Sequence, residues 1–402
     1  MKKERKKKRT AWIHPRHTLS HWLLRILAGV YSRFVYRVRI RRCRDKRQAI
    51  VLMNHTTAFD QFFVVLSLRR PAYFVSSEDL MCNGRISRFL AWAIAPIPIK
   101  KAANDARAVM NCLRVAREGG SIIMAPEGNR TYSGRTGNIK PTVAALCRAL
   151  KLPIMLYRID GGYGVFPRWS DVARKGRMSA GVSRVIEPEE YLGMSDEELF
   201  RAIAEGLYLD EARDTAVFRH KKRAEYLERA IYWCPRCGFS HLESHGDLFT
   251  CHGCGLTVRY GEDTALAGVE GEAPFRFVAD WYEAQCRAML ALDATPYYDT
   301  PLFTDTVALS TTAVCQKRTQ VMAAATLAAY ADRFEFREGD TLLSLPFAEL
   351  LAVTVLGKNK MNVYHQGTVY QVKASKRFCA LKYMNLYYRQ KEDDTDAEFL
   401  GI

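Results

Sequence analysis

The stretch Ala49-Ile50-Val51-Leu52-Met53-Asn54-His55-Thr56-Thr57-Ala58-Phe59-Asp60 decides the fold of the first half of this chain. Its first five residues form a continuous apolar run, which is typical of a strand buried on both faces of an α/β sheet. His55 then lies at the end of that strand, and Asp60 falls on the first turn of the next element. Reactive side chains in open α/β sheets gather at the carboxyl ends of strands. The stretch therefore predicts a histidine and a carboxylate that act together.

This pair suits general base catalysis. An alcohol attacks an acyl carbonyl slowly at neutral pH unless a base removes its proton, and histidine titrates near that pH. A carboxylate on the other ring nitrogen fixes the tautomer and stabilises the imidazolium, so that a substrate hydroxyl takes the place of the serine in a triad. The spacing alone also arises by chance or as satisfied polar groups at a strand end.

A second apolar run, Ser121-Ile122-Ile123-Met124-Ala125, leads into Pro126-Glu127-Gly128-Asn129-Arg130-Thr131. It is again a strand end followed by charged and small residues. Together, Asn54-His55-x-Thr57-x-x-Asp60 and this block resemble the glycerophospholipid acyltransferases, the 1-acylglycerol-3-phosphate acyltransferase family. Weaker matches are Ile97-Pro98-Ile99-Lys100-Lys101 and Leu152-Pro153-Ile154-Met155-Leu156. Lys101 stands where the family usually has arginine.

The resemblance implies a role for each residue of these blocks. His55 would be the general base and Asp60 would orient it, without an acyl-enzyme. Arg130 and Lys101 would hold the acceptor phosphate, and Glu127 would position the loop or Arg130. Gly128 would let the backbone approach the reacting centre, and Asn129 would complete the substrate-binding set. The alternative for Glu127 and Arg130 is a surface ion pair beside a turn.

Positive charge is concentrated near residue 1. The chain carries a formal net charge of +17, and residues 1–47 hold 17 basic residues but only two acidic ones. Apolar residues follow at helical spacing: Leu19, Trp22, Leu23, Ile26, Leu27, Val30 and Phe34. A basic arm with an amphipathic helix is typical of a segment on an anionic membrane surface. A core-packed helix behind a solvated tail and a nucleic-acid-binding arm are the alternatives.

No apolar run reaches the roughly 18 residues expected of a spanning helix, because Arg25 interrupts the longest stretch. We therefore expect a peripheral or monotopic protein on the cytoplasmic face of a membrane.

Four cysteines have the spacing of a zinc ribbon. Cys234 and Cys237 form one Cys-x-x-Cys pair, and Cys251 and Cys254 form a second pair, with 13 residues between the two pairs. Disulfides are the competing interpretation, which a reducing compartment would disfavour. Four thiolates leave no open position, so a zinc ion here would be structural, and no catalytic metal is expected. Because residues 232–263 are not basic, the ribbon gives little support to nucleic-acid binding.

Short β-type runs that alternate with turns from residue 303 onward, followed by a helical pattern over residues 375–390, predict a β-rich domain closed by a helix. This pattern resembles the pleckstrin-homology-like and GRAM domains. Its predicted role is to bind lipid or a partner, and a docking module without a ligand is the alternative.

The sequence thus predicts an α/β fold class: an acyltransferase domain with a mixed sheet flanked by helices, a small zinc ribbon, and the C-terminal β-rich domain. The expected boundaries are residues 1–47 for the basic arm and interfacial helix, 48–228 for the acyltransferase domain, 229–263 for the ribbon, 264–300 for a connecting helix and linker, and 301–402 for the last domain.

The predicted function is acyl transfer from acyl carrier protein or acyl-coenzyme A to 1-acylglycerol-3-phosphate, which gives phosphatidic acid in phospholipid biosynthesis. The expected partners are an anionic membrane surface, the lysophospholipid acceptor and the acyl donor. The alternatives are acylation of glycerol-3-phosphate or another lysolipid, and a non-catalytic membrane adaptor that binds lipid or nucleic acid.

Overall fold

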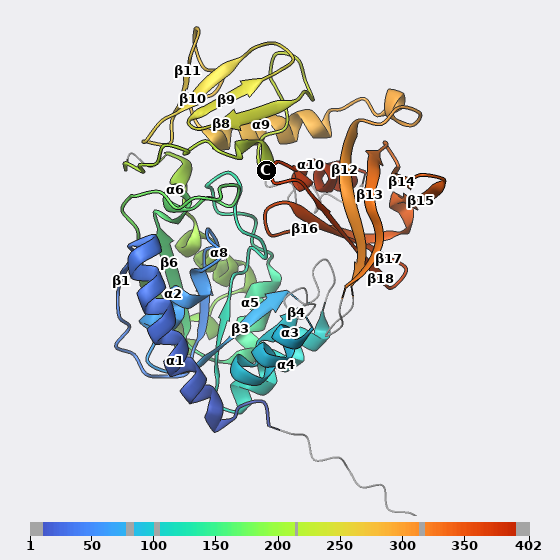
Figure 1. Ribbon diagram of the computed structural model, residues 1–402. Helices are drawn as coiled ribbons and strands as arrows, with labels where there is room; N and C mark the ends of the chain where they lie inside the picture. Colours follow the sequence, from blue (N-terminus) through green and yellow to red (C-terminus); the bar gives the residue numbers. More distant parts are fainter. Residues whose placement is uncertain (1–10, 78–83, 100–104, 214–215, 313–317, 391–402) are drawn as a thin grey trace, which may run out of the picture.

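The computed structural model describes residues 11–77, 84–99, 105–213, 216–312 and 318–390. These residues form an α/β domain, a small four-stranded sheet beyond it, and a larger C-terminal sheet at its side (Figure 1). The basic arm of residues 1–10 lies outside the described part.

The α/β domain is built on a seven-stranded mixed sheet of order β1-β7-β6-β2-β5-β3-β4, in which only β6 and β7 pair antiparallel. Its strands are β1 (Arg39–Ile40), β2 (Ile50–Met53), β3 (Ala72–Ser77), β4 (Ile97–Ile99), β5 (Ser121–Met124), β6 (Ile154–Asp160) and β7 (Ser179–Ile186). Its helices are α1 (Pro15–Tyr31), α2 (Asp60–Ser67), α3 (Arg85–Ile94), α4 (Ala106–Arg117), α5 (Thr142–Leu150), α6 (Gly162–Val165), α7 (Pro188–Leu192) and α8 (Asp196–Leu207). The expected mixed sheet flanked by helices is present.

The central strand β2 is buried along its whole length because both faces of the sheet are covered. Ile50 and Leu52 join the core beneath α4, α5 and α8. Val51 and Met53 point the other way, into the core formed with α2 and Tyr36. Alternate side chains of one apolar run therefore supply two cores, as the strand period of two requires.

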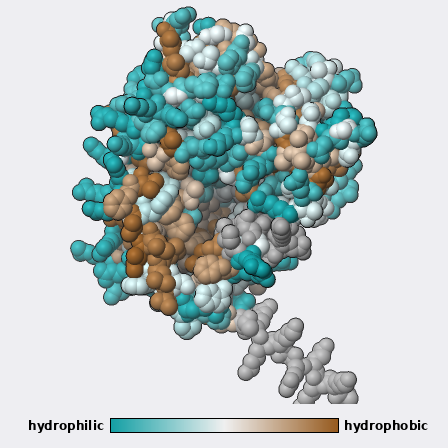
Figure 2. Space-filling view, in the orientation of Figure 1, coloured by the Kyte–Doolittle hydropathy of each residue, from teal (hydrophilic) through white to brown (hydrophobic). Residues whose placement is uncertain are grey.

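Helix α1 presents an exposed apolar face. Figure 2 shows a hydrophobic patch at the lower left, over α1, and the exposed residues there are Leu19, Trp22, Leu23, Ile26, Leu27, Val30, Tyr31 and Phe34. Phe34 belongs to a π-helical turn, Ser32–Tyr36, that continues α1. Phe89 and Trp92 of α3, which contacts α1, are also exposed. Among the described residues, no helix is both long and apolar enough to cross a membrane.

The four-stranded sheet has the order β11-β10-β9-β8, with every pair antiparallel. Its strands are β8 (Leu242–His245), β9 (Leu248–Cys251), β10 (Thr257–Tyr260) and β11 (Leu266–Gly268). Strand β11 lies beyond residue 263, within the segment expected to be a connecting helix and linker. That segment also contains α9 (Val278–Leu290), whose buried Trp281 donates to the Trp233 carbonyl at 2.8 Å. A helix is thus present in this segment, as expected, and it packs into the core.

The C-terminal sheet has the order β15-β14-β13-β12-β18-β17-β16 and is antiparallel throughout. Its strands are β12 (Phe303–Thr312), β13 (Thr319–Ala329), β14 (Arg333–Glu338), β15 (Thr341–Pro346), β16 (Leu350–Leu356), β17 (Lys360–His365) and β18 (Thr368–Ala374). Helix α10 (Ala380–Arg389) packs against β16 and β17, so the predicted terminal helix is present.

The three parts share one hydrophobic core, which runs from Tyr132 and Trp169 through the small sheet and α9 to the C-terminal sheet. The buried Arg229 joins all three through polar contacts. Its guanidinium donates to the Trp169 carbonyl and to Asp171 at 2.8 Å each, and to the Lys376 carbonyl at 2.6 Å. A buried cation with these acceptors fixes how the parts meet.

Replacing this buried cation should weaken the whole structure. We expect Arg229→Met to lower the free energy of unfolding by about 3 kcal/mol, because it removes one partner of a buried ion pair and leaves two carbonyls unsatisfied. The matched control is Arg259→Met, whose pair with Asp247 lies at the surface, with an expected loss below about 1 kcal/mol. Urea denaturation measures both, and equal losses would contradict this account.

Candidate active site

The loops that follow β2 and β5 lie side by side because the two strands are neighbours and run parallel. The Thr131 amide donates to the His55 carbonyl at 3.0 Å and joins the two loops. Asn54 ties the first loop to β6, since its side chain bonds both the amide and the carbonyl of Ile159 at 2.8 and 3.0 Å. The ends of three strands thus define one site.

His55 and Asp60 are in direct contact, at 2.9 Å between Nδ1 and Oδ2. Asp60 is fully buried, whereas the His55 side chain is 20% exposed. The carboxylate also accepts hydrogen bonds from the Thr56 and Thr57 amides and from the Thr57 hydroxyl, at 2.6 to 3.0 Å. With Asp60 on Nδ1, Nε2 is the ring nitrogen that can exchange a proton with a substrate.

Glu127 holds the loops together rather than pairing with a cation. Its Oε1 accepts from the His55 amide and its Oε2 from the Gly137 amide, each at 2.7 Å. Burial raises the pKa of Glu127 to about 8, against the two amide hydrogen bonds that favour its charged form. Glu127 was expected to position either the loop or Arg130, and its contacts match the first role. The alternative, a surface ion pair between Glu127 and Arg130, does not form.

Gly128 has a positive φ of 68°, and its amide closes a turn onto the Ala125 carbonyl at 3.0 Å. Space for a Cβ is available there, so the backbone conformation is what favours glycine. Asn129 is half-buried in the same turn.

Arg130 follows this turn, and its guanidinium forms no ion pair within the described residues. Burial and the neighbouring Arg168 guanidinium lower the pKa of Arg130 to about 10, so it stays charged at neutral pH. Lys101, the other cation expected to hold a phosphate, lies outside the described residues. The strand that leads toward it, β4, pairs with β3 at the edge of the sheet.

The sequence did not reveal the contribution of Glu211. This buried carboxylate accepts hydrogen bonds from the amides of Gly161, Gly162 and Tyr163, at 2.5 to 3.2 Å, and so holds the turn after β6. A Cβ on Gly162 would lie 2.2 Å from the Thr56 hydroxyl, which shows how closely this turn packs against the His55 loop. No local motif marks a carboxylate that is so distant in sequence from its partners.

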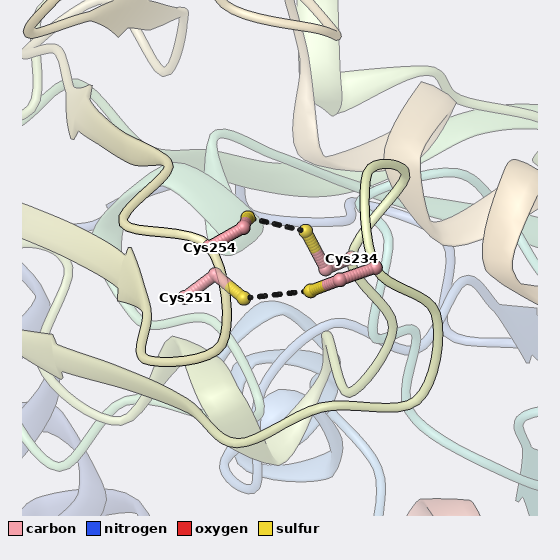
Figure 3. A group of neighbouring side chains, drawn as sticks. Cys234, Cys251 and Cys254 are labelled. Atoms are coloured by element: carbon pink, nitrogen blue, oxygen red, sulfur yellow. Dashed lines mark hydrogen bonds between the residues drawn. The ribbon is translucent and has the colours of Figure 1, made fainter.

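The four cysteines of the predicted ribbon meet at the small sheet. Two loops that carry these cysteines face each other (Figure 3). The Sγ atoms of Cys234 and Cys254 lie 3.6 Å apart. Cys237 and Cys251 are 3.3 Å apart, and all four Sγ atoms lie within 4.8 Å of one another. These separations are far longer than a disulfide bond of about 2.05 Å.

Comparison with known proteins finds similarity to acyltransferases. Residues 35–159 match the family described as Acyltransferase. The chain is 25% identical over 185 residues to a chloroplastic 1-acyl-sn-glycerol-3-phosphate acyltransferase of Arabidopsis thaliana, covering 42% of this chain and 48% of the relative. A second such chloroplastic enzyme, from Brassica napus, is 24% identical over 144 residues, covering 34% of this chain and 39% of the relative. The chain therefore spans less than half the length of each of these two relatives.

Among solved structures, the 1-acyl-sn-glycerophosphate acyltransferase of Thermotoga maritima aligns with a TM-score of 0.41 at 16% identity. The alignment covers 48% of this chain and 80% of that one. The family match includes His55, Asp60, Glu127 and Arg130. Residues 35–159, which lie in the α/β part of this chain, are thus similar to the Acyltransferase family.

Proposed function

We propose that this chain transfers a fatty acyl group from an acyl thioester to the free hydroxyl of 1-acylglycerol-3-phosphate, giving phosphatidic acid. The observation that carries the proposal is the contact between His55 and the buried Asp60 at the end of β2, with Arg130 on the adjacent loop. The family match covers these residues, and both curated relatives are named for this reaction.

In the proposed reaction, Nε2 of His55 takes the proton of the acceptor hydroxyl while the hydroxyl oxygen attacks the thioester carbonyl. Asp60 keeps the proton on Nδ1 and stabilises the imidazolium that forms. When the tetrahedral intermediate collapses, the carbon–sulfur bond breaks and the imidazolium returns a proton to the leaving thiolate. Every proton is accounted for without a covalent acyl-enzyme.

Arg130 is the cation we assign to the acceptor phosphate, because it is charged and its guanidinium is not taken by a carboxylate among the described residues. Glu127 would keep the Arg130 loop against the His55 loop, with Gly128 and Asn129 forming the turn between them. Lys101 remains a candidate second phosphate contact. The donor is acyl carrier protein or acyl-coenzyme A.

We also propose that the apolar face of α1 rests on an anionic membrane surface, on the cytoplasmic side. Tyr31 of this helix contacts Phe59, with ring centroids 4.8 Å apart, and Phe59 precedes Asp60. The exposed face is thus part of the same body as the candidate site, which suits an enzyme whose acceptor is a membrane lipid.

A structural zinc ion is proposed for the four cysteines. Four thiolates around zinc, with bonds of about 2.3 Å, place sulfur atoms about 3.8 Å apart, close to the separations between the loops. The buried Cys234 and Cys251 and the exposed Cys237 and Cys254 would hold the ion and thereby fix the small sheet. The pleckstrin-homology or GRAM-like identity of the C-terminal domain stays a prediction.

The catalytic assignment is tested by His55→Ala. We expect its kcat to fall by roughly 10²- to 10⁴-fold with lysophosphatidate and an acyl thioester, because the general base is lost. The control is His365→Ala, which removes a similar histidine that bonds Glu349 at 2.8 Å in the C-terminal domain. Measured over a panel of lysolipids and glycerol-3-phosphate, turnover by His55→Ala equal to that of the wild type would refute the proposal.

The membrane assignment is tested by replacing Trp22, Leu27 and Phe34 with serine together. Binding to vesicles of anionic phospholipid should fall by roughly 100-fold or more, because three apolar side chains no longer insert. The matched control replaces Val321, Leu342 and Leu351, which are exposed apolar residues of the C-terminal sheet. If both triple variants sediment with vesicles as the wild type does, α1 is not the membrane contact.

The metal assignment is tested by elemental analysis of protein purified under reducing conditions. We expect about one zinc per chain in the wild type and a loss of that zinc in Cys237→Ser. The control Cys43→Ser should keep its zinc, since Cys43 lies in the α/β domain. A metal-free wild-type protein that unfolds at the same temperature with and without added zinc would exclude the site.

A further inference from the structure

Four cations lie at the boundary between the α/β domain and the C-terminal sheet. They are Arg130, Arg168, Arg229 and Lys358. Within the described part of the chain, Asp171 is the carboxylate that pairs with any of them, and it serves both Arg229 at 2.8 Å and Lys358 at 2.9 Å. Positive charge is therefore in excess at this boundary.

Arg168 physically connects the two domains here. Its guanidinium donates to the Arg130 carbonyl at 2.8 Å and to the Val355 carbonyl of β16 at 3.2 Å, and it lies over the Tyr132 ring. The turn between β16 and β17, which carries Lys358, begins directly after Leu356. The C-terminal domain is thus held against the loop that carries Arg130, and Figure 1 shows the hairpin of β16 and β17 beside the α/β domain.

A chain of aromatic contacts connects Lys358 with the residues around the candidate site. Its ammonium lies 4.6 Å from the centre of the Phe166 ring, and Phe166 contacts Tyr36. Tyr36 in turn stacks on Phe59, the residue before Asp60. Burial lowers the pKa of Lys358, as do the positive charges of Arg229 and Arg130, although Asp171 opposes this effect.

The ammonium group has three N–H donors, and Asp171 accepts from one. The Lys358 side chain is 27% exposed. Like charges in a partly buried region repel, and a bound dianion would relieve that repulsion.

We propose that Lys358 is a second phosphate-binding residue of the acyl-acceptor site, acting with Arg130 across the boundary between the α/β domain and the C-terminal domain. Arg168 is a positioning residue that holds the Arg130 main chain and β16 together. The assignment to the acceptor rests on the proposed function, whereas the binding of a phosphate monoester does not. In this arrangement the C-terminal domain completes the substrate site.

Binding is measured first, with the full chain and glycerol 3-phosphate as the probe, by phosphorus NMR titration. Lys358→Met should weaken binding roughly 10-fold or more, because it removes a charged hydrogen-bond donor. Lys358→Arg should retain binding, since it keeps the charge. The matched control is Lys373→Met on the exposed face of β18, which should bind as the wild type does. Equal binding by Lys358→Met and the wild type, or no binding by the wild type, would overturn the proposal.

Kinetics then separate the acceptor from the donor. Lys358→Met should raise KM for lysophosphatidate roughly 10-fold or more while KM for the acyl thioester stays unchanged. A rise only in the donor KM would overturn the acceptor assignment. Asp171→Asn should not raise KM for lysophosphatidate. If Lys358 served only as an interdomain ion pair with Asp171, Asp171→Asn and Lys358→Met would raise this KM equally. A wild-type protein that acylates no acceptor refutes the proposed function, and the NMR titration still decides whether Lys358 binds phosphate.

Discussion

Asp60 carries its carboxylate into the interior of the α/β domain, where it accepts hydrogen bonds from two main-chain amides, one hydroxyl and the His55 imidazole. A buried carboxylate is costly unless such donors surround it, so the loop between β2 and α2 must adopt the one shape that supplies them. The donors come from Thr56 and Thr57, which explains why the loop is short and polar. The hydrogen bond between the His55 imidazole and the buried Asp60 carboxylate also orients the histidine.

The same requirement extends outward through Glu127 and Glu211. Glu127 satisfies the His55 amide, and Glu211 satisfies three amides in the turn that packs on Thr56. Each carboxylate uses main-chain donors that secondary structure leaves unpaired at strand ends. The candidate site is consequently held by three buried or half-buried carboxylates, of which Asp60 contacts the His55 imidazole and Glu127 the His55 amide. Because these carboxylates accept hydrogen bonds from other groups, Arg130 has no carboxylate partner among the described residues. A cation that binds an external anion requires such a free charge.

Local patterns predicted the parts of this structure that depend on neighbouring residues. The His55 and Asp60 spacing and the four cysteines describe groups whose partners are close in sequence. The apolar run before Asn54 predicted a buried strand from its own residues, whereas its partner strands β5 and β6 lie far along the chain. Partners distant in sequence were not predictable: Glu211 contacts a turn about 50 residues earlier, and Arg168 meets Val355. Strand β13 was not assigned individually because its run of alanines and leucine favours a helix on propensity alone, and pairing with β12 and β14 overrides that preference.

The packing of α1 links the membrane proposal to the chemistry. Arg25 would be unfavourable on an apolar face, but its guanidinium turns inward and donates to the carbonyls of Leu66 and Leu68, at the end of α2. Tyr31 contacts Phe59 at the other end of α2, beside Asp60. Helix α1 is therefore fixed to both ends of α2, the helix that begins with Asp60. A lipid acceptor that leaves a bilayer beneath α1 would reach His55 without any movement of the helix relative to the site, so that membrane binding and acceptor binding would use one rigid surface.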